Sequence, residues 1–160
     1  MKQNIKFNSY SLIVTVGVLM LFVIGIFSVM GTDKLIPFCI IAGGVTIVGL
    51  YYCPKSVEAN ESGLTLHRLL SKPKVFPWSD IESVDTFYPS AGGLRLCASG
   101  GFFGFWGNFS DIMTGSYFGY YGSRDSCILV KMKDGKQYVI GCANPVALTD
   151  YIMATYLHCP

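Results

Sequence analysis

The chain has 160 residues, of which 51% are hydrophobic and only 14% are charged, and its formal net charge is +2. Soluble domains ordinarily carry about 25% charged residues, so this composition excludes a disordered chain and a coiled coil, and it argues against an ordinary cytosolic enzyme. A net charge this small also argues against a nucleic-acid-binding protein, which must neutralise many phosphates.

Two long uncharged runs lie near the N-terminus, at residues 11–30 and 35–53, with a short turn between them. About 20 apolar residues at a rise of 1.5 Å cover the hydrocarbon core of a bilayer, which is ~30 Å thick. Two buried helices of a soluble bundle are the alternative, but each would keep a polar face, and neither run has one. A signal peptide would have a shorter apolar region and a small-residue cleavage site. We therefore predict a transmembrane helical hairpin over 11–53, preceded by an N-terminal cytoplasmic arm of residues 1–10.

The positive charges near these runs predict the orientation of the hairpin. They lie mainly outside the turn: Lys2 and Lys6 before the first run, and Lys55, Arg68, Lys72 and Lys74 after the second, against Lys34 in the turn. Because short loops rich in Lys and Arg remain on the cytoplasmic side, both termini of this multi-pass protein are predicted to be cytoplasmic.

In residues 54–160, apolar and polar residues alternate as they do in β-strands. We interpret this part as a separate domain and expect it to fold without the helices. This part holds nine Lys or Arg and nine Asp or Glu, so its own net charge is zero. Short extended segments alternate with turns, and the clearest hairpin crosses Asp134-Gly135 between two β-branched runs. Asn144 followed by Pro145 then predicts a C-terminal helix, with an N-cap and a proline at the first helical position.

The predicted fold class is therefore α+β, an antiparallel domain of six to seven strands closed by a C-terminal helix. The strand order, the stretch from Trp78 to Ile81, the hairpin around Asp134-Gly135 and the Asn-Pro helix start resemble the bacterial pleckstrin-homology (PH-like) domain family. The likeness covers about residues 56–157, and members commonly carry a transmembrane hairpin before the domain. It implies a PH-like β-barrel or sandwich, a bacterial inner-membrane location and a binding fold without catalytic residues. One departure is Val146 after the Asn-Pro, where members often have an acidic residue.

The resemblance also suggests phosphoinositide binding, which the residues oppose. In lipid-binding PH domains the turn between the first two strands carries Lys and Arg. Here the corresponding turn, residues 60–63, reads Asn-Glu-Ser-Gly, and Glu58 lies nearby. Because this turn has no cluster of cationic donors for phosphate, phosphoinositide binding is not expected.

No pattern of catalytic or metal-binding residues accompanies the domain. The six cysteines include no Cys-x-x-Cys pair, so no zinc or thioredoxin-like chemistry is expected, and a cytoplasmic domain keeps its thiols reduced. The histidines, His67 and His158, have no catalytic spacing to Ser, Cys or Asp. The neighbouring carboxylates Asp80, Glu82 and Asp85 are interpreted as charges on a solvent face. We predict no catalytic residues, no cofactor and no metal.

The most unusual stretch, residues 92–122, contains nine glycines and nine aromatic residues. Glycine weakens regular strands and aromatic rings need burial, so the rings either fill the domain's own core or form a contact surface for a partner or the bilayer. The candidate interaction surface comprises Phe102, Phe103, Phe105, Trp106 and Phe109. Because Gly104 and Gly107 flank it, the Phe105-Trp106 pair is predicted to be at least partly exposed.

These observations predict a membrane-anchored, non-catalytic interaction or scaffolding module at the inner face of the membrane. Its expected partners are the bilayer, contacted by two transmembrane helices, and a protein or a second copy of the chain. The alternative is an accessory or regulatory subunit of a membrane-associated enzyme or transport complex.

Overall fold

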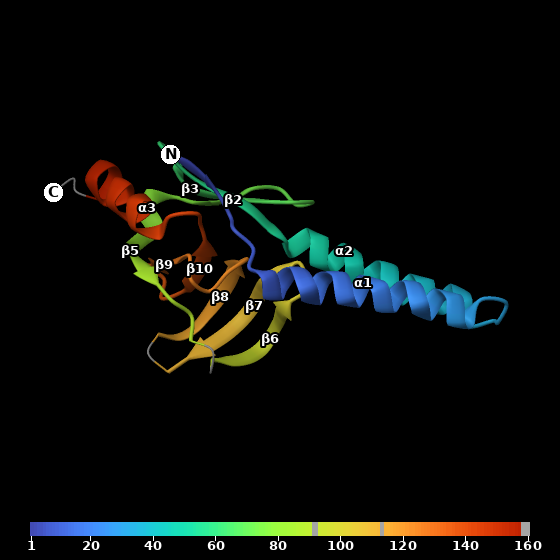
Figure 1. The fold of residues 1–160 in the computed structure, drawn as a ribbon. Helices are drawn as coiled ribbons and strands as arrows, with labels where there is room; N and C mark the ends of the chain where they lie inside the picture. The colour runs from blue at the N-terminus through green and yellow to red at the C-terminus, as the bar shows by residue number, and fades with distance from the viewer. Residues whose placement is uncertain (91–92, 113, 158–160) are drawn as a thin grey trace.

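The computed structural model describes residues 1–90, 93–112 and 114–157, and Figure 1 shows a helical pair beside a β-rich domain. The helices and strands, in chain order, are β1 (Lys2–Asn4), α1 (Ser9–Val29), α2 (Leu35–Tyr52), β2 (Pro54–Asn60), β3 (Gly63–Arg68), β4 (Lys74–Phe76), β5 (Ile81–Phe87), β6 (Leu94–Gly101), β7 (Gly104–Asp111), β8 (Gly115–Tyr121), β9 (Cys127–Met132), β10 (Gln137–Gly141) and α3 (Pro145–Ile152). A 3₁₀ turn at Trp78–Asp80 precedes β5, and a π-helical turn at Met153–Leu157 follows α3.

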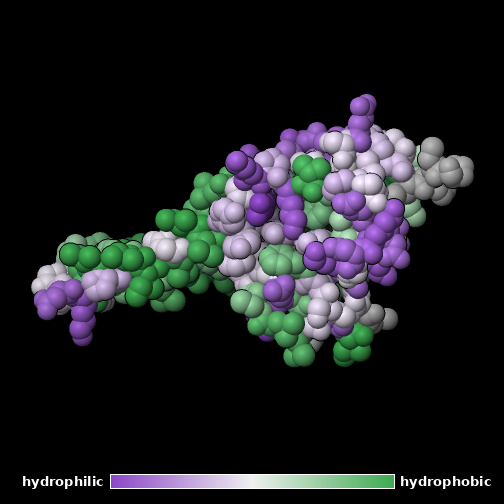
Figure 2. Space-filling model, turned by 180° about the vertical axis from the view of Figure 1, so that it is seen from behind, coloured by the Kyte–Doolittle hydropathy of each residue, from purple (hydrophilic) through white to green (hydrophobic). Residues whose placement is uncertain are grey.

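Helices α1 and α2 are long and apolar enough to cross a membrane, at 21 and 18 residues. The Asn8 side chain caps α1 by accepting the Ser11 N–H at 2.9 Å, which explains why the helix begins before the uncharged run. Figure 2 shows a hydrophobic surface over the projecting helical pair and a hydrophilic patch at its far tip. This surface is compatible with a lipid bilayer, and the bounds of both helices lie close to the predicted runs.

The β-rich part consists of two sheets. One has the strand order β1-β2-β3-β4, and the other has the order β5-β9-β10-β8-β7-β6. The hairpin β9–β10 and the helix that starts at Pro145 confirm two predictions, and α+β is the correct class. The prediction of an all-antiparallel domain is wrong, because β10 returns beside β8 and runs parallel to it. The domain also has more strands than the predicted six to seven.

The sheets do not close into a barrel. Within the described part of the chain, β1 and β4 end the smaller sheet, and β5 and β6 end the larger one. Helix α3 packs against β5 and β9 and covers one side of the larger sheet, as Figure 1 shows. Its Asn144 side chain accepts the Ala147 N–H at 3.1 Å, the predicted N-cap bond.

Apolar side chains occupy both faces of the β9–β10 hairpin. On one face, Ile128, Val130 and Ile140 pack with residues of β2, β3 and α3. On the other face, Leu129 and Val139 lie among the buried aromatic rings of β7 and β8. Since β9 and β10 are covered on both sides, their sequences read as nearly continuous apolar runs.

The N-terminal arm, predicted as a segment separate from the domain, is one of its strands. In β1, Lys2 lies opposite Glu58 and Asn4 lies opposite Ser56 of β2. The residue that follows β1 in the chain, Ile5, is 6% exposed and belongs to the core. A three-residue strand carries no readable periodicity, which is why the sequence alone did not reveal this pairing.

The fragment 54–160 is therefore expected to be less stable than the domain with its arm. Removing residues 1–8 exposes the edge of β2 and the apolar surface under Ile5, whose burial contributes about 1.5–3 kcal/mol. We expect this fragment to melt at a clearly lower temperature than the same fragment with residues 1–8 joined to Pro54 by a flexible linker. Circular dichroism melts test this expectation, and equal melting temperatures would contradict it.

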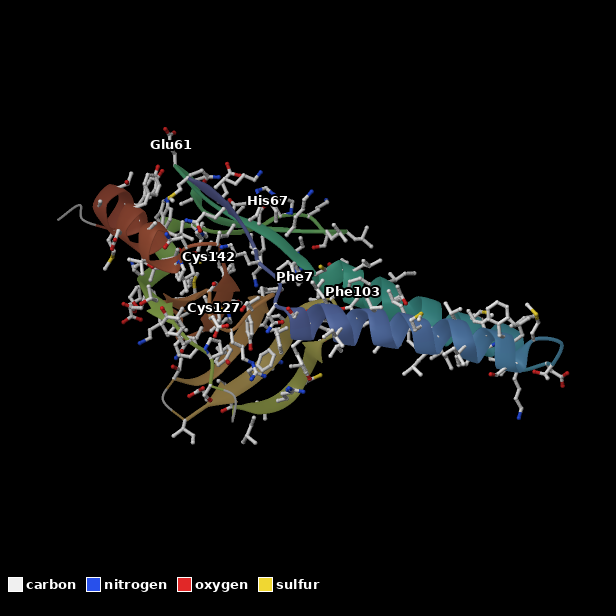
Figure 3. The ribbon with its side chains drawn as sticks, viewed as in Figure 1. Phe7, Glu61, His67, Phe103, Cys127 and Cys142 are labelled. Carbon is white, nitrogen blue, oxygen red and sulfur yellow. The ribbon has the colours of Figure 1, made fainter. Side chains whose placement is uncertain are left out.

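The cysteines divide into buried and exposed thiols. The five that the structure describes are free; Cys127 and Cys142 lie inside the domain (Figure 3), whereas Cys97 on β6 is exposed, and Cys159 falls outside the described residues. Burial raises the pKa of Cys142 to about 12 and the pKa of Cys127 well above its ordinary value.

Maleimide is expected to label the exposed thiols much faster than the buried ones. At pH 8, a thiol pKa raised by about three units leaves on the order of a thousandfold less thiolate than an ordinary cysteine has, and burial also blocks access. In a full-length Cys39→Ser/Cys159→Ser variant, Cys97 should label within minutes, and Cys127 and Cys142 only after unfolding. Mass spectrometry of the labelled peptides measures the rates. Labelling of Cys142 as fast as Cys97 would contradict the burial.

Candidate functional site

The β6–β7 turn is docked against the base of α1. Ser11 is 1% exposed, and its hydroxyl donates to the Gly101 carbonyl oxygen at 2.8 Å. One helical turn further on, the Thr15 hydroxyl oxygen accepts the Phe103 N–H at 2.9 Å and lies 3.2 Å from the same Gly101 oxygen. Residues four apart share one helix face, so α1 presents both hydroxyls to the turn. Figure 3 shows Phe103 at this junction of helices and sheets.

Aromatic rings extend the junction to both helices. Three pairs join a helix to the turn or to β7: Tyr10 with Phe105 at 6.2 Å, Phe22 with Phe102 at 6.5 Å and Tyr52 with Trp106 at 4.9 Å between ring centroids. Gly49 of α2 makes room for this packing, because a Cβ there would lie 2.6 Å from the Phe103 ring. Hydrogen bonds and ring contacts together hold the domain against the helical pair.

Two of the five predicted contact residues are core residues. Phe105 and Phe109 are 1% and 4% exposed and pack with Tyr121 at 5.1 and 5.7 Å between ring centroids. The expectation that Phe105 is exposed is therefore wrong. The flanking Gly104 and Gly107, at φ of +96° and +115°, do not loosen the strand but let it bend so that the Phe105 ring turns inward.

The other three predicted residues face the helices. Phe102, Phe103 and Trp106 are half-buried between the β6–β7 hairpin and the two helices. A signal for this docking was present in the sequence, because Ser11 and Thr15 are hydroxyl residues spaced four apart at the start of an apolar helix. Nothing in the sequence identified their partner, since the turn lies 86 to 90 residues further along the chain.

The docking predicts a specific effect of removing the two hydroxyls. In a Ser11→Val/Thr15→Val variant, the Phe103 N–H and the Gly101 carbonyl lose their hydroxyl partners on α1, and a buried donor left unpaired costs about 1–3 kcal/mol. We expect a lower midpoint of urea unfolding in detergent micelles and a red-shifted Trp106 emission, measured in a Trp78→Phe background.

Thr46→Val is the matched control for this experiment. The Thr46 hydroxyl lies on α2 and donates to the Ala42 carbonyl of its own helix at 2.8 Å, so its loss leaves the junction intact. Equal unfolding midpoints and equal emission spectra for the double variant and the control would show that the turn is not held by α1.

Strand β6 leaves apolar side chains uncovered at the edge of the larger sheet. Leu94 and Leu96 are 69% and 62% exposed. A register shift against β7 falls between Arg95 and Cys97, a bulge of the kind that blunts sheet edges. These two leucines offer apolar contact area at an edge of the sheet.

The histidine and the neighbouring carboxylates noted in the sequence have ordinary structural contacts. Asp80 and Asp85 are exposed and accept hydrogen bonds from the Ser79 and Ser83 hydroxyls, and Glu82 is also exposed. His67 Nε2 lies 3.1 Å from Glu58 Oε2, and Lys2 Nζ lies 3.6 Å from the same oxygen. The hydrogen bond to His67, together with the charge of Lys2, lowers the pKa of Glu58. Among the residues that the structure describes, no group of three or more His, Cys, Asp and Glu side chains is placed to hold a metal ion. His158 lies outside that part of the chain.

Comparison with known proteins identifies no relative: no family model, curated protein or solved structure matches the chain.

Proposed function

We propose that the chain is a membrane-anchored, non-catalytic interaction module, of PH-like type, whose helices α1 and α2 cross the inner membrane of a bacterial cell. The observation that carries this proposal is the docking of the β6–β7 turn on α1 through Ser11 and Thr15. A domain that needed only a membrane tether could be joined to it by a flexible linker. Here only Cys53 separates the end of α2 at Tyr52 from the start of β2 at Pro54. The domain is held in one orientation, which suits presentation of a surface at the membrane.

Both termini are assigned to the cytoplasmic side. The pairing of β1 with β2 supports this assignment, because it requires the N-terminal residues and the domain to lie on the same side of the bilayer. The excess of Lys and Arg outside the turn favours the cytoplasm as that side. Reporter fusions at the N-terminus, within residues 31–34 and at the C-terminus test the topology, and an external C-terminus would overturn it.

The exposed part of β6 is the surface proposed for a protein partner. Leu94 and Leu96 offer apolar contact area beside the docked turn. We propose a photo-crosslinking amino acid at Leu96, with Glu82 as control, because Glu82 is exposed on β5 at the opposite edge of the same sheet.

We expect a discrete protein adduct from position 96 and not from position 82. A second copy in the adduct would identify self-association, and a subunit of an enzyme or transporter would identify the accessory role. Adducts with lipid alone, or equal adducts from both positions, would overturn the assignment of this surface.

A further inference from the structure

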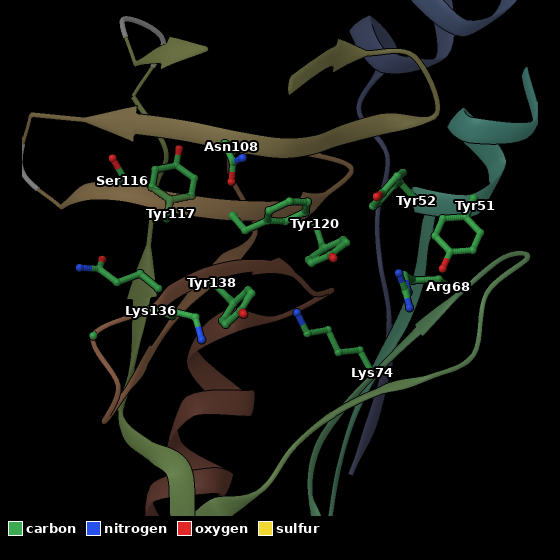
Figure 4. Close-up of a pocket in the computed structure, with 13 residues that line it drawn as sticks. Tyr51, Tyr52, Arg68, Lys74, Asn108, Ser116, Tyr117, Tyr120, Lys136 and Tyr138 are labelled. Atoms are coloured by element: carbon green, nitrogen blue, oxygen red, sulfur yellow. The ribbon is translucent and has the colours of Figure 1, made fainter. Parts of the chain in front are cut away.

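An open cleft of about 620 Å³ lies between the two sheets, beside the end of α2 (Figure 4). Its volume falls in the range of small-molecule sites, about 300–1,000 Å³. Cationic and phenolic side chains dominate the lining: Arg68, Lys74, Lys136, Tyr51, Tyr120 and Tyr138. They come from α2, β3, β4, β8, β10 and the β9–β10 turn, so the folded domain brings them together from distant parts of the chain.

Tyrosine rings hold the two central cations in place. The Arg68 guanidinium lies 5.4 Å from the Tyr51 ring centroid and 5.9 Å from that of Tyr120. The Lys74 ammonium lies 4.1 Å from the Tyr138 centroid and also 5.9 Å from Tyr120. Cation–π contacts orient a charge without neutralising it, so both cations keep their affinity for an anion. In Figure 4, the Lys74 side chain extends toward Tyr138 across the space between the sheets.

The cleft is positive although the domain as a whole is neutral. Its lining includes no Asp or Glu, and of its three cations only Lys136 is paired, with Asp134 at 2.7 Å. Over the described residues, no carboxylate oxygen lies within 4.0 Å of Arg68 or Lys74. The Arg68 Nη2 donates to the Lys72 carbonyl, but its buried Nε has no hydrogen-bond partner in the same part of the chain.

The phenol hydroxyls add neutral donors to this positive site. Burial raises the pKa of Tyr120 to about 12, so its hydroxyl keeps its proton at neutral pH and can donate. Guanidinium, ammonium and hydroxyl donors converging on one space are the groups that bind the several oxygens of a phosphate.

The cleft also lies at the base of the helical pair. Tyr51 is the penultimate residue of α2, and the Leu69 N–H donates to the Cys53 carbonyl at 3.0 Å, which ties the β3–β4 connection to the end of the helix. In that connection Leu69 and Leu70 are 48% and 57% exposed. Exposed leucines beside Arg and Lys at the end of a membrane-spanning helix suit the headgroup layer.

We propose that this cleft binds a phosphate group, with Arg68 and Lys74 as its charged ligands. The phosphate belongs either to a phospholipid headgroup or to a soluble phosphate compound, and the headgroup source rests on the proposed membrane anchoring. The site is separate from the acidic turn at residues 60–63, which lies at the opposite end of β3. Arg68 and Lys74 are close in sequence, but the rings that orient them come from α2, β8 and β10, so the sequence alone does not show the site.

Fluorescence of Trp106 provides the readout, because this ring stacks at 4.9 Å on Tyr52, a residue of the cleft lining. The full chain, in a Trp78→Phe background, is titrated in neutral detergent with inorganic phosphate and glycerol 3-phosphate at constant ionic strength. In a second arm, the chain is placed in phosphatidylcholine nanodiscs with increasing fractions of phosphatidic acid. Lys74→Gln and Arg68→Gln test the cleft. Lys72→Gln is the matched control, because it removes an equal charge from the same connection outside the lining.

We expect a saturable change that Lys74→Gln and Arg68→Gln each weaken about tenfold or more, and that Lys72→Gln leaves within about twofold. Saturation in detergent means that a soluble phosphate compound is enough to fill the cleft. Saturation only in nanodiscs means that the ligand is the phosphate of a lipid headgroup. The absence of saturation in both arms, or equal weakening by Lys72→Gln and Lys74→Gln, overturns the proposal. The detergent arm remains informative if the helices do not span a membrane, and neither arm depends on a protein partner at β6.

Discussion

Replacing Phe105 by alanine is expected to destabilise the full chain by about 3–5 kcal/mol, as large-to-small changes of buried aromatic residues do. The ring is 1% exposed and lies stacked at 5.1 Å from Tyr121 and 6.2 Å from Tyr10. The Arg124 guanidinium lies 5.0 Å from the same ring. The substitution therefore removes contacts to the core, to α1 and to a cation at once.

Urea unfolding in neutral detergent micelles, followed by circular dichroism, measures this loss. Tyr88→Ala is the control, because Tyr88 is an aromatic residue that is 61% exposed, and we expect its replacement to change the free energy of unfolding by about 0.5 kcal/mol or less. An equally small effect of Phe105→Ala would mean that the ring is exposed, as its glycine neighbours first suggested.

The elements that the sequence predicted correctly are those whose signal is local. Uniform hydropathy marks α1 and α2, the Asp134-Gly135 turn marks the β9–β10 hairpin, and Asn144 with Pro145 marks the start of α3. Each of these signals lies within one continuous segment of the chain, so no knowledge of the tertiary structure is needed to read it. The pairing of β8 with β10 is different, because alternation predicts a strand and not the direction of its neighbour.

The glycine-aromatic stretch could not be assigned because its glycines make room for rings of the same stretch that meet only when its strands pair. A Cβ at Gly119 would lie 2.8 Å from the Tyr121 ring and 2.9 Å from the Phe109 ring, so these two rings cover the glycine. Glycine there provides space for neighbouring side chains and does not mark a loose strand. The same limit applies to the cleft, since Arg68 and Lys74 become a site only when β3, β4 and β8 come together.

A side chain at Gly107 would clash with the backbone of a neighbouring strand. Its φ is +115°, and an added Cβ would lie 2.4 Å from the Cys97 carbonyl oxygen and 2.7 Å from the Ala98 Cα on the neighbouring strand β6. Both contacts are to backbone atoms, which cannot move aside without displacing β6. Since β6 ends in the turn that contacts Ser11 and Thr15, such a displacement also disturbs the docking on α1.

We therefore expect Gly107→Ala to destabilise the full chain by about 3 kcal/mol or more, because backbone strain of about 1–3 kcal/mol adds to the displacement of β6. Gly115→Ala separates these two contributions. Gly115 has a φ of +79°, and among the described atoms none lies within 4 Å of its added Cβ, so only the cost of the left-handed backbone, about 1–2 kcal/mol, is expected there. Urea unfolding of both variants in micelles gives the difference, and Trp106 emission reports the junction. If Gly107→Ala costs no more than Gly115→Ala and leaves the emission unchanged, β6 does not pack against β7 as closely as this structure requires.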